Sequence, residues 1–146
     1  MMKVDIIALG KLKEKYLRDA SGEYEKRLSR YCDLKITELN PVLLSDNPSK
    51  NEIENALSRE KEMILKQIPK DAFTVALCVE GKEIPSEELA VLFKEKANEG
   101  KRICFVIGSS YGLSEEVKKS ADMRLSVSPM TFPHQLFRIM LLEQFN

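Results

Sequence analysis

Two short stretches of this chain carry no charged residue, and they constrain the fold more than any other feature. They are Ala72–Val79 and Ile103–Ile107, and a glycine follows each closely, at Gly81 and Gly108. A strand with one face in water alternates apolar and polar residues, whereas a strand covered on both faces is continuously apolar. We therefore expect both stretches to be strands of a mostly parallel sheet with helices on both faces, and Ala72–Val79 to be a central, doubly covered strand.

Strand and helix patterns alternate through the rest of the chain. Val4–Leu9 predicts a first strand, the alternation in Leu34–Leu39 predicts a strand near a sheet edge, and Met123–Val127 predicts a last strand. Apolar residues that recur every three or four positions predict helices between the strands. In the first helix, expected over 11–31, they are Leu12, Tyr16, Ala20, Tyr24 and Leu28, and Leu17 and Tyr31 widen the apolar stripe. Five repeats of strand and helix predict one α/β domain over residues 1–146.

Helix starts carry their own signals. Ser49 and Glu52 have the spacing of a capping box. Ser86 and Ser114, each followed by two glutamates, are expected to be N-caps. Pro133 suits the first turn of a terminal helix.

Composition excludes several classes of protein. Lys plus Arg and Asp plus Glu both number 23, so no bulk positive charge drives non-specific binding to nucleic acid. Cys32, Cys78 and Cys104 are odd in number and lie far apart, so we expect neither a disulfide framework nor a metal site. Cys78 and Cys104 lie inside apolar runs, and we expect them to be buried core thiols. No apolar stretch is long enough for a signal peptide or a membrane span, and we expect a cytoplasmic protein.

The carboxyl ends of the predicted strands are the expected place for a ligand, because open α/β sheets bind ligands there. The glycine-bearing turn 108–112 matches neither dinucleotide nor triphosphate fingerprints, which disfavours a cofactor held by its phosphates. The connection from Ser126 to Gln135 has two prolines and backbone groups in need of partners. A flat heteroaromatic ligand would satisfy those groups, and a rigid loop satisfied by water is the alternative.

Several strings in the sequence resemble one known family. They are Gly10–Lys13, Glu23–Leu28, Phe105–Gly108, Gly112–Leu113, Met130–Gln135, Arg138 and Leu142–Gln144. On these strings, which extend over nearly the whole chain, it resembles the small SPOUT-superfamily enzymes of the ribosomal RNA large subunit methyltransferase H family.

The resemblance implies a fold, a cofactor and a substrate. The fold would have a C-terminal trefoil knot that forms a pocket for S-adenosylmethionine, in an obligate homodimer. The reaction would be methylation of N3 of a pseudouridine in 23S ribosomal RNA within the assembled ribosome. Carried over by motif, the cofactor-binding residues would be Leu77, Gly108, Val127, Ser128, Pro129, Met130, Thr131 and Phe132.

His134 and Arg138 are the candidate catalytic residues. They lie four positions apart on the terminal helix and would therefore share one face, where they could position the target base or its phosphate. The alternative for His134 is a hydrogen bond within the first helical turn, and for Arg138 a salt bridge at a subunit interface. The same helix is apolar on nearly every side, which favours burial against a second copy of the chain.

Two departures from the family pattern keep other functions open. Ser109 stands where the family usually has a glycine, and the family continues beyond Glu143 and Gln144 with a tail that faces the RNA. Impaired turnover is one expectation from these departures. The alternatives are a non-catalytic, ribosome-associated dimer without that active-site tail, or an α/β protein that binds a nucleotide or a flavin.

Overall fold

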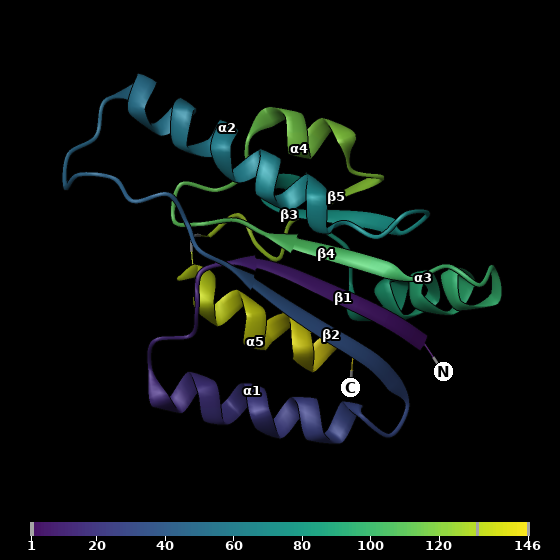
Figure 1. Cartoon of the computed structure of the whole chain (residues 1–146). Coiled ribbons are helices and arrows are strands. Elements are labelled where there is room, and N and C mark those ends of the chain that lie inside the picture. The colour runs from purple at the N-terminus through teal and green to yellow at the C-terminus, as the bar shows by residue number, and fades with distance from the viewer. Residues whose placement is uncertain (1, 131, 146) are drawn as a thin grey trace.

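Strands and helices alternate along the chain (Figure 1). The computed structural model describes residues 2–130 and 132–145. In chain order the elements are β1 (Met2–Leu9), α1 (Lys15–Leu28), β2 (Cys32–Leu39), α2 (Lys50–Gln67), β3 (Phe73–Lys82), α3 (Ser86–Asn98), β4 (Ile103–Ile107), α4 (Glu115–Ser120), β5 (Met123–Leu125) and α5 (His134–Phe145). This order confirms the predicted α/β class.

The strands form one sheet in the order β2-β1-β4-β3-β5, and all four pairings are parallel. β2 is an edge strand, as its alternating pattern predicted. β4 is buried along its whole length, as its uncharged sequence predicted. The trefoil knot that the resemblance implies stays a prediction.

β3 is covered over only part of its length, which corrects the prediction of a doubly covered strand. Thr74, Val75 and Ala76 are buried, whereas Val79 is 54% exposed. The pairing of β3 with β4 ends at Ala76, opposite Val106, so the following residues extend beyond the covered part of the sheet. They border the cavity described below, and an uncharged sequence suits that environment as well as a core.

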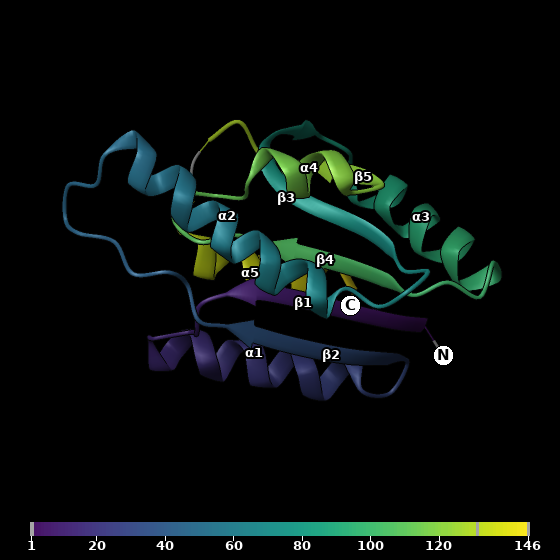
Figure 2. The same cartoon turned by 45° about the horizontal axis from the view of Figure 1, so that its top comes forward.

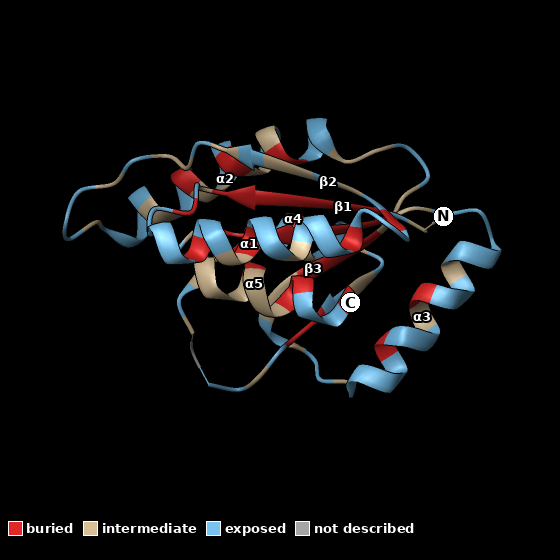
Figure 3. Cartoon of the chain, turned by 90° about the horizontal axis from the view of Figure 1, so that it is seen from below, coloured by how far each residue is buried: buried red, intermediate tan, exposed pale blue. Residues whose placement is uncertain are grey.

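Helices cover both faces of the sheet (Figures 1 and 2), as predicted. On one face α2 and α4 bury Ile64 and Val117 against Cys104 and Val106 of β4. On the other face α1, α3 and α5 cover a core that includes three aromatic rings. The ring of Phe93 meets those of Phe105 and Phe145 edge-on, with centroids 5.9 and 5.2 Å away. Figure 3 shows buried residues on the strands and on the inner sides of the helices.

Two of the three predicted helix caps are confirmed. Ser49 and Glu52 form the capping box at the start of α2, and the Ser114 hydroxyl accepts a hydrogen bond from Val117 N in α4. The prediction for Ser86 is wrong, because Pro85 holds the N-cap position of α3. The Ser86 hydroxyl instead donates to Gln144 Oε1 in α5, 2.5 Å away, and so links two helices.

α1 is shorter than predicted and buries only part of the predicted apolar stripe. It begins at Lys15 rather than Lys11, and its buried residues are Leu17, Ser21 and Leu28. Tyr16, expected in the apolar stripe, is 69% exposed. Residues 11–14 belong to the connection from β1 to α1.

Replacing Gly22 with alanine is expected to raise the free energy of unfolding by about 1 kcal/mol, because glycine is a poor helix former. A Cβ at this position in α1 meets no heavy atom within 4 Å, so nothing opposes the gain. Urea denaturation measures it. Gly100→Ala is the matched control, since its Cβ also has open space but its φ of +74° strains a side chain. G100A should be less stable than the wild type. A G22A variant that is less stable than the wild type would contradict the prediction.

Candidate functional site

A cavity of about 650 Å³ lies at the carboxyl ends of three strands. Its walls are the end of β3, the turn 108–113 after β4, the segment 125–128 around the end of β5, and residues 132–134 with Phe137. This is the end of the sheet where the sequence predicted a ligand. The volume falls in the range of small-molecule sites, which is roughly 300–1,000 Å³.

Five of the eight predicted cofactor residues line this cavity. They are Leu77, Gly108, Val127, Ser128 and Phe132. Pro129 and Met130 do not line it, and Met130 is 70% exposed. Thr131 lies outside the described residues. The cofactor role of the eight residues stays a prediction.

Glycines let the backbone segments around the cavity approach one another closely. A Cβ on Gly108 would overlap the Gly112 carbonyl and lie 3.0 Å from Leu113 Cγ. A Cβ on Gly81 would lie 2.7 Å from the backbone nitrogen of Leu125. The turn after β4 and the contact between β3 and β5 therefore both depend on a missing side chain.

The loop after β5 satisfies part of its own backbone. The Ser126 hydroxyl donates to Ser128 O at 3.1 Å, and the Ser128 hydroxyl accepts from Met130 N at 3.0 Å. The sequence predicted either a ligand or water as the partner of these groups. Serine hydroxyls are instead the partners of two of these backbone groups, Ser128 O and Met130 N, and these hydrogen bonds hold the loop without a ligand.

A charged pair in the cavity wall escaped the sequence analysis, and a thiol in the same wall is less buried than predicted. Lys118 Nζ of α4 contacts Glu80 Oε1 of β3, and this hydrogen bond holds the pKa of Glu80 below its ordinary value. Cys78 lines the same wall and is only half-buried, although it was predicted to be a core thiol. Burial raises its pKa, so the protonated thiol is favoured.

Cys104 is a buried thiol, as predicted, and Cys32 is buried as well. Burial raises the pKa of Cys104 to about 12 and that of Cys32 to about 11. In the described part of the chain, no three His, Cys, Asp or Glu side chains are grouped closely enough to hold a metal ion. Nor does any helix among the described residues have the length and apolarity to cross a membrane.

His134 lies at the first turn of α5 and lines the cavity beside Phe132 and Pro133. Its pKa is lowered by burial first and then by the charges of Arg138 and Lys13. The ring is therefore neutral at neutral pH and carries one donor and one acceptor nitrogen. A neutral imidazole can hydrogen-bond a base edge without adding charge to the cavity.

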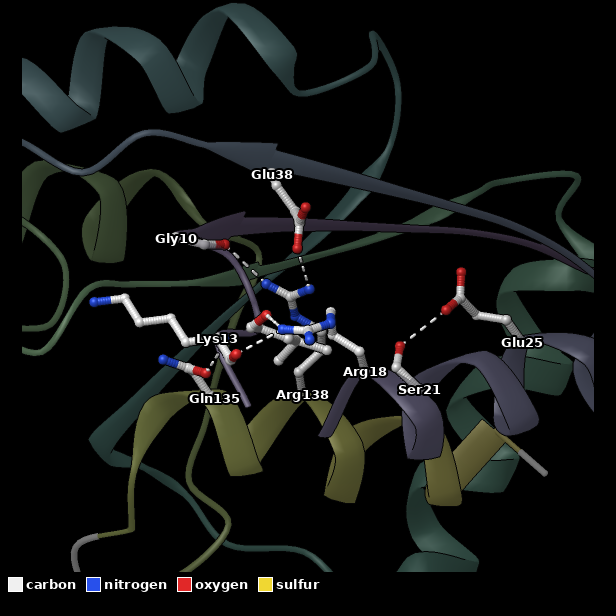
Figure 4. A network of polar contacts seen from close by, with 9 residues as sticks. Gly10, Lys13, Arg18, Ser21, Glu25, Glu38, Gln135 and Arg138 are labelled. Atoms are coloured by element: carbon white, nitrogen blue, oxygen red, sulfur yellow. Dashed lines mark hydrogen bonds and ion pairs between the residues drawn. The ribbon is translucent and has the colours of Figure 1, made fainter. Parts of the chain in front are cut away.

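Arg138 does not line the same cavity as His134, although the two residues are four positions apart. Its guanidinium is buried and donates to Glu38 Oε2 of β2 at 2.6 Å and to the Gly10 carbonyl at 2.9 Å (Figure 4). Its Nε has no hydrogen-bond acceptor among the described residues. In this chain Arg138 therefore joins α5 to the ends of β1 and β2, and its role toward a substrate stays a prediction.

A match to a known family covers nearly the whole chain. The family model described as "Predicted SPOUT methyltransferase" matches residues 2–145. The chain belongs to the SPOUT methyltransferase family. This membership confirms the family indicated by the sequence strings.

Curated relatives of this SPOUT methyltransferase match it over 144 residues, which are 98% of this chain and 91% of each relative. A protein of Methanococcus maripaludis, named putative ribosomal RNA large subunit methyltransferase H, is 47% identical. Two proteins named ribosomal RNA large subunit methyltransferase H, from Clostridium botulinum and Clostridioides difficile, are 48% and 46% identical.

Proposed function

We propose that this chain uses S-adenosylmethionine to methylate N3 of a pseudouridine in 23S ribosomal RNA of the assembled ribosome. The observation that carries the proposal is the cavity at the ends of β3, β4 and β5 in a chain of the SPOUT methyltransferase family. The names of the curated relatives support the ribosomal RNA substrate. Membership of the SPOUT methyltransferase family supports S-adenosylmethionine as the cofactor.

The residues around the cavity fit this cofactor. Gly108 keeps a side chain out of the turn, and Leu77, Val127 and Phe132 supply apolar surface for a flat adenine ring. We assign Pro129, Met130 and Thr131 to the same loop around the cofactor. When bound, S-adenosylmethionine supplies a methyl group already activated by the sulfonium. The protein's work is then to bring the acceptor nitrogen into line and keep water away.

We assign His134 to the acceptor side of the site. Its neutral ring borders the cavity and can hydrogen-bond a carbonyl or ring nitrogen of the target base. Arg138 holds α5, and hence His134, against the ends of β1 and β2 through Glu38 and Gly10. Arg138 thus acts as a positioning residue.

We propose that a second copy of the chain covers α5. Leu136, Phe137, Ile139 and Met140 of this helix are only half-buried. An apolar helix face of this kind is normally covered, and a symmetric homodimer is the commonest way to do so. The proposed ribosomal substrate agrees with a cytoplasmic location for this protein.

The deciding measurements are calorimetry with S-adenosylmethionine and transfer of its labelled methyl group to 70S ribosomes from a strain without this modification. We expect binding, and a single labelled nucleotide in 23S ribosomal RNA. Binding without transfer would favour a non-catalytic dimer over the proposal. A bound flavin, or tighter binding of a nucleotide than of S-adenosylmethionine, would contradict the proposed cofactor.

A further inference from the structure

A second cavity, of about 500 Å³, adjoins the first. The two share Ser109, Ser110, Tyr111 and His134 as lining residues. Methyl transfer needs the acceptor atom in line with the donor, so an acceptor site must open onto the donor cavity. The second cavity meets that condition.

The lining of the second cavity suits a flat polar ring. Apolar side chains from the loop after β2 and from α2 form part of it, namely Val42, Leu43, Ile53 and Leu57. Asn40, Glu60 and Gln135 add hydrogen-bonding groups. Two exposed lysines, Lys11 and Lys13, also border the cavity, where they can meet the phosphates of a nucleotide. A nucleobase with its phosphates in solvent matches this chemistry.

Glu60 of α2 is the buried carboxylate of this cavity, with only 3% of the residue exposed. Its Oε2 accepts from Val42 N at 2.9 Å, and its Oε1 accepts from the Ser109 hydroxyl at 3.3 Å. The second distance is long for a bond between two oxygens, so Oε1 is loosely held. Burial raises the pKa of Glu60 and makes its carboxylate a better proton acceptor than one in water.

We propose that the second cavity receives the acceptor base and that Glu60 accepts the proton which the ring N–H of that base loses. This inference rests on the proposed function, because an imide nitrogen such as N3 of pseudouridine is a weak nucleophile until its proton leaves. The proton passes from the ring nitrogen to Glu60 Oε1. The electron pair on that nitrogen forms the new bond to the methyl carbon, and the electrons of the broken carbon–sulfur bond stay on sulfur.

Other titratable side chains border the same cavity and must be separated from Glu60. They are Lys11, Lys13, Tyr111 and His134. The neutral ring of His134 can also accept a proton, whereas Glu60 is the carboxylate of this cavity, so removing Glu60 alone separates the two groups. With Glu60 as acceptor, the methylation rate should rise with pH as its carboxyl group ionises and then level off.

The test compares Glu60→Gln with Glu54→Gln in the full chain. Glutamine keeps the shape of Glu60, can still accept from Val42 N and can still hydrogen-bond Ser109, but it takes no proton. Glu54 lies on the exposed side of α2, so E54Q makes the same chemical change away from both cavities. The measurements are thermal unfolding, calorimetry with S-adenosylmethionine, and single-turnover methylation of unmodified 70S ribosomes over a range of pH.

We expect E60Q to have the same unfolding temperature and the same affinity for S-adenosylmethionine as the wild type. Its methylation rate should be about 10²–10⁴ times lower, as is typical when a general base is lost. Its remaining activity should lack the rise with pH, whereas E54Q should behave like the wild type. An E60Q that methylates at the wild-type rate, or keeps the wild-type pH profile, would overturn the inference. A wild-type chain that methylates no ribosome would overturn the proposed function, and this inference with it.

Discussion

Arg138→Ala is expected to lower the free energy of unfolding by about 3 kcal/mol. The substitution removes a guanidinium whose side chain is 5% exposed, and it leaves Glu38 and the Gly10 carbonyl without their partner. Removing one partner of a buried ion pair costs roughly 3–5 kcal/mol. Because Glu38 is 34% exposed and can be partly rehydrated, we expect the lower end of that range. Urea denaturation measures the loss.

Arg59→Ala is the control for Arg138→Ala. Arg59 is an exposed arginine on α2, and its removal should change stability by less than about 0.5 kcal/mol. The double variant E38Q/R138A should lose less free energy of unfolding than the sum of the two single variants, because the two side chains interact directly. An R138A chain as stable as R59A but unable to methylate ribosomes would instead make Arg138 a substrate-binding residue.

Gly108→Ala is expected to weaken binding of S-adenosylmethionine by roughly ten- to a hundredfold. The added Cβ would overlap the Gly112 carbonyl, so the turn that lines the cavity must move. Overpacking of this kind costs about 1–3 kcal/mol, and each 1.4 kcal/mol corresponds to about a factor of ten in affinity. Calorimetry with S-adenosylmethionine measures the change.

Gly22→Ala serves as the control for Gly108→Ala. It makes the same substitution in α1, where the new methyl group meets no heavy atom within 4 Å. Its affinity for S-adenosylmethionine should equal that of the wild type. If G108A binds as tightly as G22A, the turn after β4 does not hold the cofactor.

The element types of this fold could be predicted because they depend on local pattern. Uncharged runs indicated β3 and β4, and strict alternation indicated the edge strand β2. The errors lie where a distant partner decides the outcome. The Ser86 hydroxyl bonds Gln144 instead of capping α3. The backbone N–H of Lys13, a residue predicted to lie in the first helix, donates to Gln135 Oε1 of α5.

The candidate site was predictable in part. The motif resemblance named Leu77, Gly108, Val127, Ser128 and Phe132, and all five border one cavity. Glu60 was missed although it left a signal. It occupies a position in the apolar stripe that runs through Ile53, Leu57 and Ile64, where a carboxylate must be buried and needs hydrogen-bond donors.

The sequence by itself determined the alternating α/β class, the parallel direction of the strands and the motifs of the SPOUT methyltransferase family, since each depends on residues close together in the chain. Only the tertiary structure decided the strand order, the pairing of Arg138 with Glu38 and the meeting of Glu60 with Ser109. Each of these joins segments far apart in sequence. Their partners are chosen by packing and by the burial of charge, which no local pattern records.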